Sequence, residues 1–108
     1  MNLSNLSETL GLDEADVLDL VELFLDTCEA DVNTIEEGVK AGDHQQVADA
    51  AHSIKGASGN MRFEAIYALA KTIEDTARGH ALTDVIEHLA GIRKELEQIS
   101  SDLKNVHQ

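Results

Sequence analysis

Apolar residues recur three and four positions apart along most of this chain, and no other feature limits its possible folds so strongly. Such spacing places the apolar side chains on one face of an α-helix. Proline is absent and only three residues are aromatic, so the composition also favours helix over sheet. The four predicted apolar stripes are Val17, Leu20, Val21, Phe24, Leu25, Cys28, Val32, Ile35 and Val39; Val47, Ala51, Ile54, Ser58 and Met61; Ile66, Leu69, Ile73 and Ala77; and Val85, Ile86, Leu89, Ile92, Leu96, Ile99 and Leu103.

Residues that commonly begin and end helices separate these stripes. A short first helix precedes Asp13, which is the predicted N-cap of a long second helix that Gly42 closes. Asp43 and Gln46 resemble a capping box at the start of the next helix, and Gly79 ends the one after it. We therefore predict helices at about residues 4–10, 13–40, 43–60, 63–78 and 82–105.

Four long amphipathic helices joined by short loops favour one particular fold class. They predict an all-α protein, an antiparallel up-down-up-down four-helix bundle with the short first helix capping one end. The sequence contains no internal repeat, low-complexity tract or flexible linker. We therefore expect residues 1–108 to form a single domain.

The charge distribution indicates which class of molecule the chain would bind. The formal net charge is −13, and residues 1–50 contain thirteen acidic residues and one basic residue. Such a chain repels nucleic acid and anionic lipid, so its expected partners are proteins. No apolar run has the length that a membrane span needs. The first residues, Met1-Asn2-Leu3-Ser4, lack the charged and apolar regions of a signal peptide, so we expect none. The single Cys28 cannot form an internal disulfide, and we expect a cytoplasmic protein.

His52 is the candidate functional residue of the second stripe's helix. At about 100° per residue it lies about 140° around the helix from Val47, so it should face water. Small residues predominate on the same face, which leaves the imidazole clear for a partner protein. The neighbours on or next to this face are Gln45, Ala48, Asp49, Lys55, Gly56 and Gly59.

Two glycines close to His52 support a functional interpretation. A glycine inside a helix costs about 1 kcal/mol relative to alanine, and Gly56 and Gly59 lie within one turn of each other. Gly59 could be a helix C-cap, but Gly56 cannot then be one as well. The alternative for Gly56 is close packing against a neighbouring helix. Loss of helix propensity beside an exposed histidine is typical of a functional site.

Lys55, three residues after His52, places an ammonium group on the adjoining face. A lysine beside a histidine is commonly just part of a solvated helix face, and only the glycine context favours a functional role. A phosphoryl group on the histidine would add about −1.5 to −2 charge by analogy with other phosphorylated side chains. In a chain of this net charge, a nearby ammonium would offset part of the repulsion.

At these residues the chain resembles the histidine-containing phosphotransfer (HPt) family. The segment His52-Ser53-Ile54-Lys55-Gly56-Ala57-Ser58 matches the family's His-x-x-Lys-Gly motif with its following small residues. Ala41-Gly42-Asp43 resembles the turn that precedes the histidine helix. Residues 69–78 are similar to the family's Leu-Ala-x-x-Leu-Glu-x-x-Ala-Arg segment, and the resemblance covers about residues 13–103.

The resemblance implies a phosphorelay intermediate of two-component signalling. His52 would accept a phosphoryl group from a receiver-domain aspartyl phosphate and pass it reversibly to another receiver. Lys55 would stabilise the phosphoryl charge and Gly56 would permit close approach. The chain would be a carrier rather than an enzyme, with no cofactor of its own and with Mg²⁺ on the receiver. Its partners would be receiver domains of response regulators or of a hybrid sensor kinase, and it would be a monomer.

One residue departs from the family's pattern. The family usually has glycine ten residues after the histidine, where this chain has Arg62. Asn60 adopts the left-handed conformation more readily than most residues, so the turn between the two helices could have moved there. Arg62 could instead contact the partner. The candidate partner-binding residues are Gln45, Ala48, Asp49, Gly59 and Arg62.

Three alternatives remain open at this point. A sensor-kinase dimerisation domain also has a helical histidine, but its motif has an acidic residue after the histidine and a proline nearby, and Ser53 follows here. A metal-binding bundle would need paired ligands, whereas the other histidines lie in different predicted elements and are better explained as surface residues. An adaptor that binds receivers without carrying phosphate is disfavoured by the intact motif. The other histidines are His44, His80, His88 and His107.

Overall fold

The computed structural model describes residues 2–106, which form five helices and no strand. The helices are α1 (Leu3–Leu10), α2 (Glu14–Ala41), α3 (His44–Met61), α4 (Glu64–Arg78) and α5 (Val85–Val106). The prediction of an all-α fold is confirmed. No helix among the described residues is both long and apolar enough to cross a membrane.

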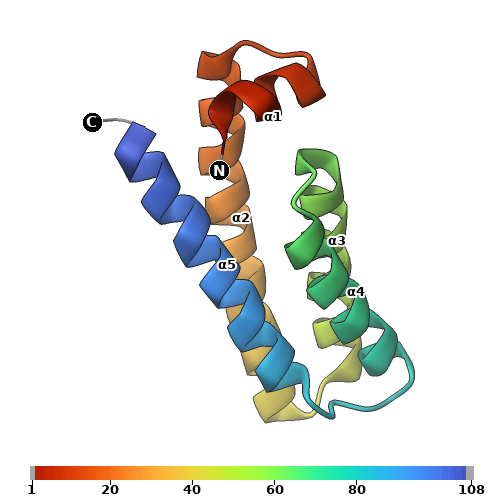
Figure 1. The fold of residues 1–108 in the computed structure, drawn as a ribbon. Helices are drawn as coiled ribbons and strands as arrows, with labels where there is room; N and C mark the ends of the chain where they lie inside the picture. Colours follow the sequence, from red (N-terminus) through yellow and green to blue (C-terminus); the bar gives the residue numbers. More distant parts are fainter. Residues whose placement is uncertain (1, 107–108) are drawn as a thin grey trace.

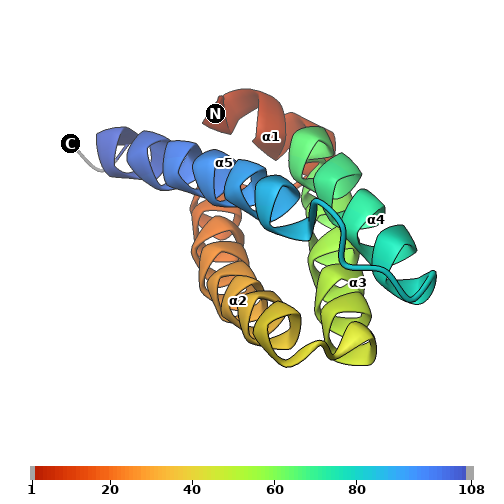
Figure 2. The ribbon, with the colours of Figure 1, turned by 90° about the horizontal axis from the view of Figure 1, so that it is seen from below.

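The four long helices lie side by side, and each runs opposite to the one before it (Figure 1). The closest packing is between α3 and α4, followed by α2 with α3 and α4 with α5. Contact between α2 and α5 is sparser, and α1 lies across one end of α2 (Figures 1 and 2). Helix α3 is therefore held between α2 and α4, and one face of it is left open.

The turn between α2 and α3 follows the predicted capping signals in part. Gly42 has a left-handed backbone (φ 68°) and caps α2, and the Asp43 carboxylate accepts a hydrogen bond from the Gln46 backbone amide at 3.0 Å. The Gln46 side chain does not complete a capping box. It donates instead to the Thr34 carbonyl at 2.9 Å, and so links α3 to α2.

The turn after α3 corrects one expectation. Asn60 lies within the helix, and Arg62 itself has the left-handed backbone (φ 65°) that caps α3. The Arg62 and Phe63 amides donate to the Gly59 and Ser58 carbonyls, so the turn keeps its place although it lacks a glycine.

The connection between α4 and α5 also differs from the prediction. Gly79 follows the end of α4 but has φ −81°, and the left-handed residue is His80 (φ 62°). The last helix begins at Val85 rather than near residue 82, because Asp84 also has positive φ and keeps the preceding residues outside the helix.

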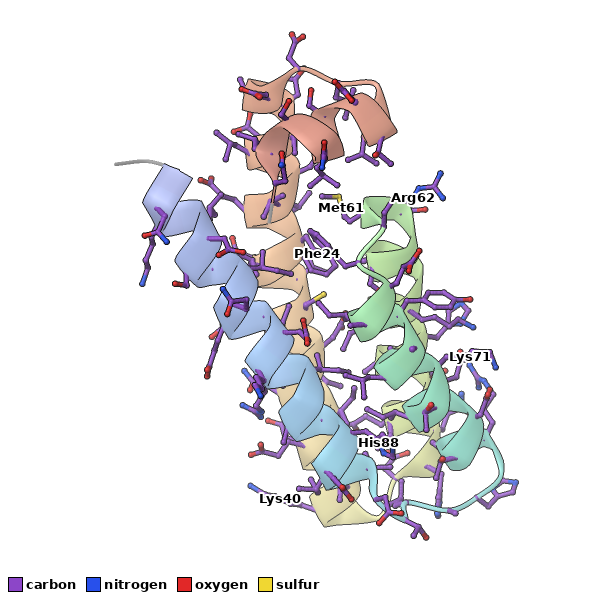
Figure 3. All side chains as sticks on the ribbon, in the orientation of Figure 1. Phe24, Lys40, Met61, Arg62, Lys71 and His88 are labelled. Carbon is purple, nitrogen blue, oxygen red and sulfur yellow. The ribbon has the colours of Figure 1, made fainter. Side chains whose placement is uncertain are left out.

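The predicted stripes form the core with two exceptions. Phe24 packs on Phe63 with ring centroids 5.0 Å apart, at the end of the bundle where Met61 also points inward (Figure 3). Leu20 and Ile86, which were expected to be buried, are exposed. Leu20 lies at the edge of its stripe, and Ile86 lies in the first turn of α5, about 100° around from buried Val85.

Candidate functional site

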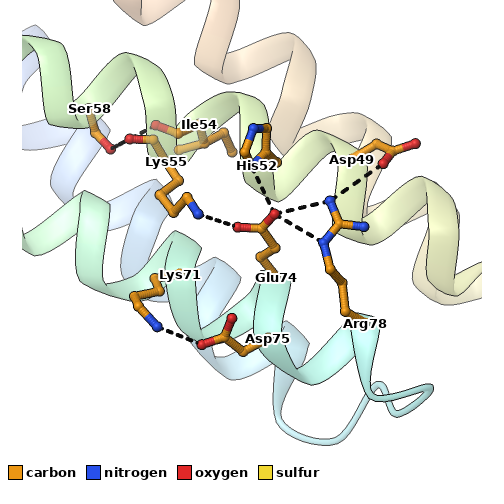
Figure 4. Close-up of polar contacts among 9 residues, drawn as sticks. All are labelled: Asp49, His52, Ile54, Lys55, Ser58, Lys71, Glu74, Asp75 and Arg78. Atoms are coloured by element: carbon orange, nitrogen blue, oxygen red, sulfur yellow. Dashed lines mark hydrogen bonds and ion pairs between the residues drawn. The ribbon is translucent and has the colours of Figure 1, made fainter.

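His52 projects from the middle of α3 with 63% of its side chain exposed, as the sequence predicted. Its Nδ1 atom lies 2.8 Å from Oε2 of Glu74 on α4 (Figure 4). A carboxylate can only accept this hydrogen bond, so Nδ1 carries the ring proton. In the neutral imidazole the other nitrogen, Nε2, then has a free lone pair and is the nucleophilic atom.

Glu74 is the residue that joins the site together. Only 4% of it is exposed. Besides His52, its carboxylate contacts Lys55, whose Nζ lies 2.7 Å from Oε1, and Arg78, whose Nη2 and Nε donate to Oε2 at 3.0 and 3.2 Å (Figure 4). Burial by itself would raise the pKa of Glu74, but the contacts from Lys55, Arg78 and His52 lower it below its ordinary value. Glu74 is therefore ionised at neutral pH.

The sequence analysis did not single out Glu74, although one signal pointed to it. Ala70, Glu74 and Ala77 follow one another at steps of four and three, so Glu74 occupies an apolar-stripe position of α4. A charged residue at such a position needs a partner of opposite charge, and Arg78, four residues later on the same helix, offers one.

Lys55 lies less open to solvent than the helix-face argument suggested. A quarter of its side chain is exposed, and its ammonium is already paired with Glu74. The position of the Lys55 ammonium is therefore set by Glu74 of α4 as well as by its own helix, α3.

The two glycines of α3 have different surroundings. A Cβ atom added to Gly56 would meet no other atom within 4 Å, which excludes close packing of a neighbouring helix as its explanation. A Cβ on Gly59 would lie 3.4 Å from the Tyr67 ring of α4, an ordinary contact distance. Gly59 lies inside the helix and is not its C-cap. The space over Gly56 is thus open for an atom from another molecule.

Of the candidate partner-binding residues, only some lie exposed near His52. Gln45 and Asp49 are exposed and bonded to each other at 2.8 Å, with Asp49 3.8 Å from Arg78. Ala48 is only 1% exposed, so the expectation that it lies on the open face beside His52 is wrong, and it offers a partner little surface. The tight packing of α4 against α3 covers the Ala48 side of the predicted face.

Arg62 lies away from His52, at the opposite end of the helix from the loop before α3. Its side chain points outward from the bundle (Figure 3). Ten residues of helix separate it from His52, which corresponds to roughly 15 Å.

His44, His80 and His88, the other histidines that the structure describes, do not belong to a metal centre. No group of three or more potential metal ligands occurs within residues 2–106. The His44 and His80 rings meet edge to face with centroids 5.9 Å apart, and His88 contacts the Asp84 carbonyl. His107 lies outside the described residues.

Comparison with known proteins gives one match to a protein family. The family model described as Hpt domain matches residues 19–102, which is most of the chain and includes both helices of the site. No curated protein and no solved structure matches the chain. Since the family match covers far more than half of the sequence, the chain belongs to the Hpt domain family, the histidine phosphotransfer modules of two-component and phosphorelay signalling.

Proposed function

We propose that His52 carries the phosphoryl group in a phosphorelay. Its Nε2 atom would attack the phosphorus of a receiver-domain aspartyl phosphate, so that the N–P bond forms, the P–O bond breaks and the aspartate leaves as a carboxylate. The reverse reaction would deliver the group to a second receiver. The observation that carries this proposal is an exposed imidazole whose inner nitrogen is bonded to a buried, ionised carboxylate.

Glu74 is a positioning residue in this mechanism. When a neutral imidazole attacks through Nε2, the ring gains positive charge while Nδ1 keeps its proton. The carboxylate 2.8 Å from Nδ1 stabilises that charge and fixes the ring orientation. It also keeps the proton on the phosphorylated ring, which makes the ring a good leaving group for the return step. Reversible transfer follows from the same contact.

Lys55 and Arg78 supply positive charge to the site. Lys55 and Arg78 both contact Glu74, and Arg78 also lies 3.8 Å from Asp49, so two cations balance two carboxylates beside His52 although the whole chain is strongly acidic. Phosphoryl transfer depends mainly on positioning and charge neutralisation. Lys55 would therefore offset charge on the phosphoryl oxygens, with a net effect of about 1 kcal/mol because it remains partly solvated. Mg²⁺ is expected on the receiver, and we assign no cofactor to this chain.

A leucine patch next to α3 marks where the receiver would dock. The bond of 2.7 Å between Ser53 and Asp31 defines the side of α2 that faces α3. Leu20 and Leu23 lie within about 20° and 80° of Asp31 around α2, and both are exposed, Leu23 by 62%. Tyr67 of α4 is also exposed, beside Gly59. A receiver over the open space at Gly56 would cover these apolar side chains on both sides.

The test of this function replaces the proposed acceptor. His52→Gln should fold normally, because the side chain is mostly exposed, and should no longer be labelled by a phosphorylated receiver. His88→Gln, on α5, is the matched control and should be labelled as before. The label on the native protein should be lost in acid and survive alkali, as phosphohistidine does. A labelled His52→Gln protein would place the phosphoryl group on another residue.

We also expect the protein to act as a monomer in the cytoplasm. An Hpt domain is a phosphotransfer carrier and not a kinase.

A further inference from the structure

A second surface feature lies between α2 and α5, away from His52. The two helices diverge toward the C-terminal end of α5 (Figure 1). A groove of about 470 Å³ lies between them. Its floor is apolar, and two of the leucines in it are only partly buried. The floor residues are Leu25, Val32, Leu96 and Leu103.

The rim of this groove is acidic. Glu22, Asp26 and Glu29 line it from α2, and Glu97 lines it from α5. The one basic residue of the lining, Arg93, donates a 2.6 Å hydrogen bond to Glu36, so its charge is engaged there. Asp26, Glu29 and Glu97, against one guanidinium that is paired with Glu36, give the groove a negative potential that matches the net charge of the chain.

The groove and the phosphoryl site lie on different sides of α2. Asp31 marks the side that faces α3, because it bonds to Ser53. Glu29 in the groove lies about 200° around α2 from Asp31. A ligand in the groove would therefore leave His52 and the leucine patch free for a receiver.

We propose that this groove binds a cationic amphipathic helix of a partner protein. Along α2 the groove runs from Glu22 to Asn33, roughly 16 Å or three helical turns, which suits a short helix. The apolar floor would take leucine-like anchors at i, i+3, i+4 and i+7, and the carboxylates would pair with flanking lysine or arginine. A second copy of this chain is a poor occupant, because its own groove would bring carboxylates against carboxylates. This inference is independent of the phosphorelay function.

The test uses a designed probe and the complete protein. A fluorescein-labelled peptide of about 15 residues, with leucine at the four anchor spacings and lysine or arginine elsewhere, is titrated by fluorescence anisotropy. A control peptide keeps the leucines and has glutamate at every position where the probe has lysine or arginine. The basic peptide should bind saturably, more weakly as salt is raised, and it should shift backbone amide resonances of α2 and α5. His52→Gln should bind it equally well.

Charge reversal in the groove provides the matched comparison. Glu29→Lys/Glu97→Lys should weaken binding about tenfold or more, because two attractive contacts become repulsive. Glu8→Lys/Glu87→Lys changes the net charge equally at exposed positions outside the groove and should weaken it less than about threefold. Equal binding of both peptides, equal loss in both double variants, or resonance shifts confined to α3 and α4 would overturn the proposal. The proposal would also be overturned if the native protein self-associated and Glu29→Lys/Glu97→Lys self-associated more strongly, because a second copy of the chain would then occupy the groove.

Discussion

The contacts of Glu74 account for most of the chemistry at the site. One buried carboxylate meets an imidazole, an ammonium and a guanidinium, and each of these groups comes from a side chain that solvent also reaches. Burying a lone carboxylate would be very unfavourable. Contacts with the three donors offset the unfavourable burial of the carboxylate. In the proposed mechanism they also leave the ring proton of His52 on Nδ1.

Replacing Glu74 tests this role. Glu74→Gln keeps the shape and a hydrogen-bond acceptor but removes the negative charge, so the attacking ring loses charge stabilisation. We expect receiver-dependent phosphorylation of His52 to slow about tenfold, equivalent to about 1.4 kcal/mol, while exposure of the ring is unchanged. Rapid-quench kinetics measure the rate. A normal rate in the variant would reduce Glu74 to a structural residue.

The same residue predicts a pH dependence of stability. The pKa of Glu74 is lowered in the folded protein, so its stabilising contribution is complete above the ordinary glutamate pKa and is lost as the pH falls through the lowered value. The unfolding free energy of the native protein should therefore fall more steeply below about pH 4.5 than that of Glu74→Gln. Urea unfolding at several pH values measures both. Parallel curves would contradict the prediction.

Arg62 is a residue under backbone strain. Its left-handed conformation costs a non-glycine residue about 1 kcal/mol or slightly more. Arg62→Gly should therefore raise the unfolding free energy by up to about 1 kcal/mol, offset in part by the greater entropy of glycine in the unfolded chain. Asn60→Gly, two residues earlier and inside the regular helix, should lower it. A lower stability of Arg62→Gly in urea unfolding would mean that the arginine side chain contributes contacts of its own.

At the scale of elements, α3 has given up helix propensity where another molecule is expected to approach. No atom of the chain uses the space at Gly56, whereas a Cβ on Gly38 in α2 would lie 2.7 Å from the Val47 side chain. Glycine therefore occurs at these two positions for opposite reasons. Gly38 allows α3 to pack closely against α2, whereas Gly56 leaves open space on the outer surface of the bundle.

Substitution of these glycines separates the two causes. Gly56→Ala should stabilise the protein by about 1 kcal/mol, because alanine is the better helix former and its methyl group meets nothing. Gly38→Ala should destabilise it through overpacking. Gly56→Leu should fold well and yet block transfer from a receiver. Thermal unfolding and a transfer assay measure these outcomes, and normal transfer in Gly56→Leu would contradict the access argument.

At the scale of the whole molecule, three of the five exposed large apolar side chains among the described residues lie beside the open face of α3, and the other two are Leu12 and Ile86. Leu20 and Leu23 lie on the α3 side of α2, and Tyr67 flanks α3 from α4. Ile86, 52% exposed, lies on α5 and serves as a comparison of similar chemistry.

A matched pair of substitutions tests the receiver-docking surface. Leu23→Glu should lower the rate of transfer from a limiting concentration of receiver about tenfold, because it places a charge in an apolar contact. Ile86→Glu should leave the rate unchanged. Phosphorylation of His52 by a small donor such as phosphoramidate should be equal in both variants, which separates docking from chemistry. Equal transfer rates in the two variants would move the docking surface elsewhere.

The sequence by itself determined the helices and several residues of the site. Apolar spacing and capping residues act within one helix, so they predicted the all-α fold, the buried positions of α3 and the exposure of His52. The motif around Lys55 and Gly56 is also local. Their roles in phosphoryl transfer stay predictions until the variants are measured.

Only the tertiary structure decided which side chains meet across helices. Glu74 lies 22 residues from His52 in the sequence, and their contact depends on how α4 is rotated and aligned against α3. The same packing buried Ala48, while Leu20 and Ile86 stayed exposed where no helix covers them. Helical periodicity gives the direction of each side chain from its own axis, but the neighbour it meets is set by the packing of the whole bundle.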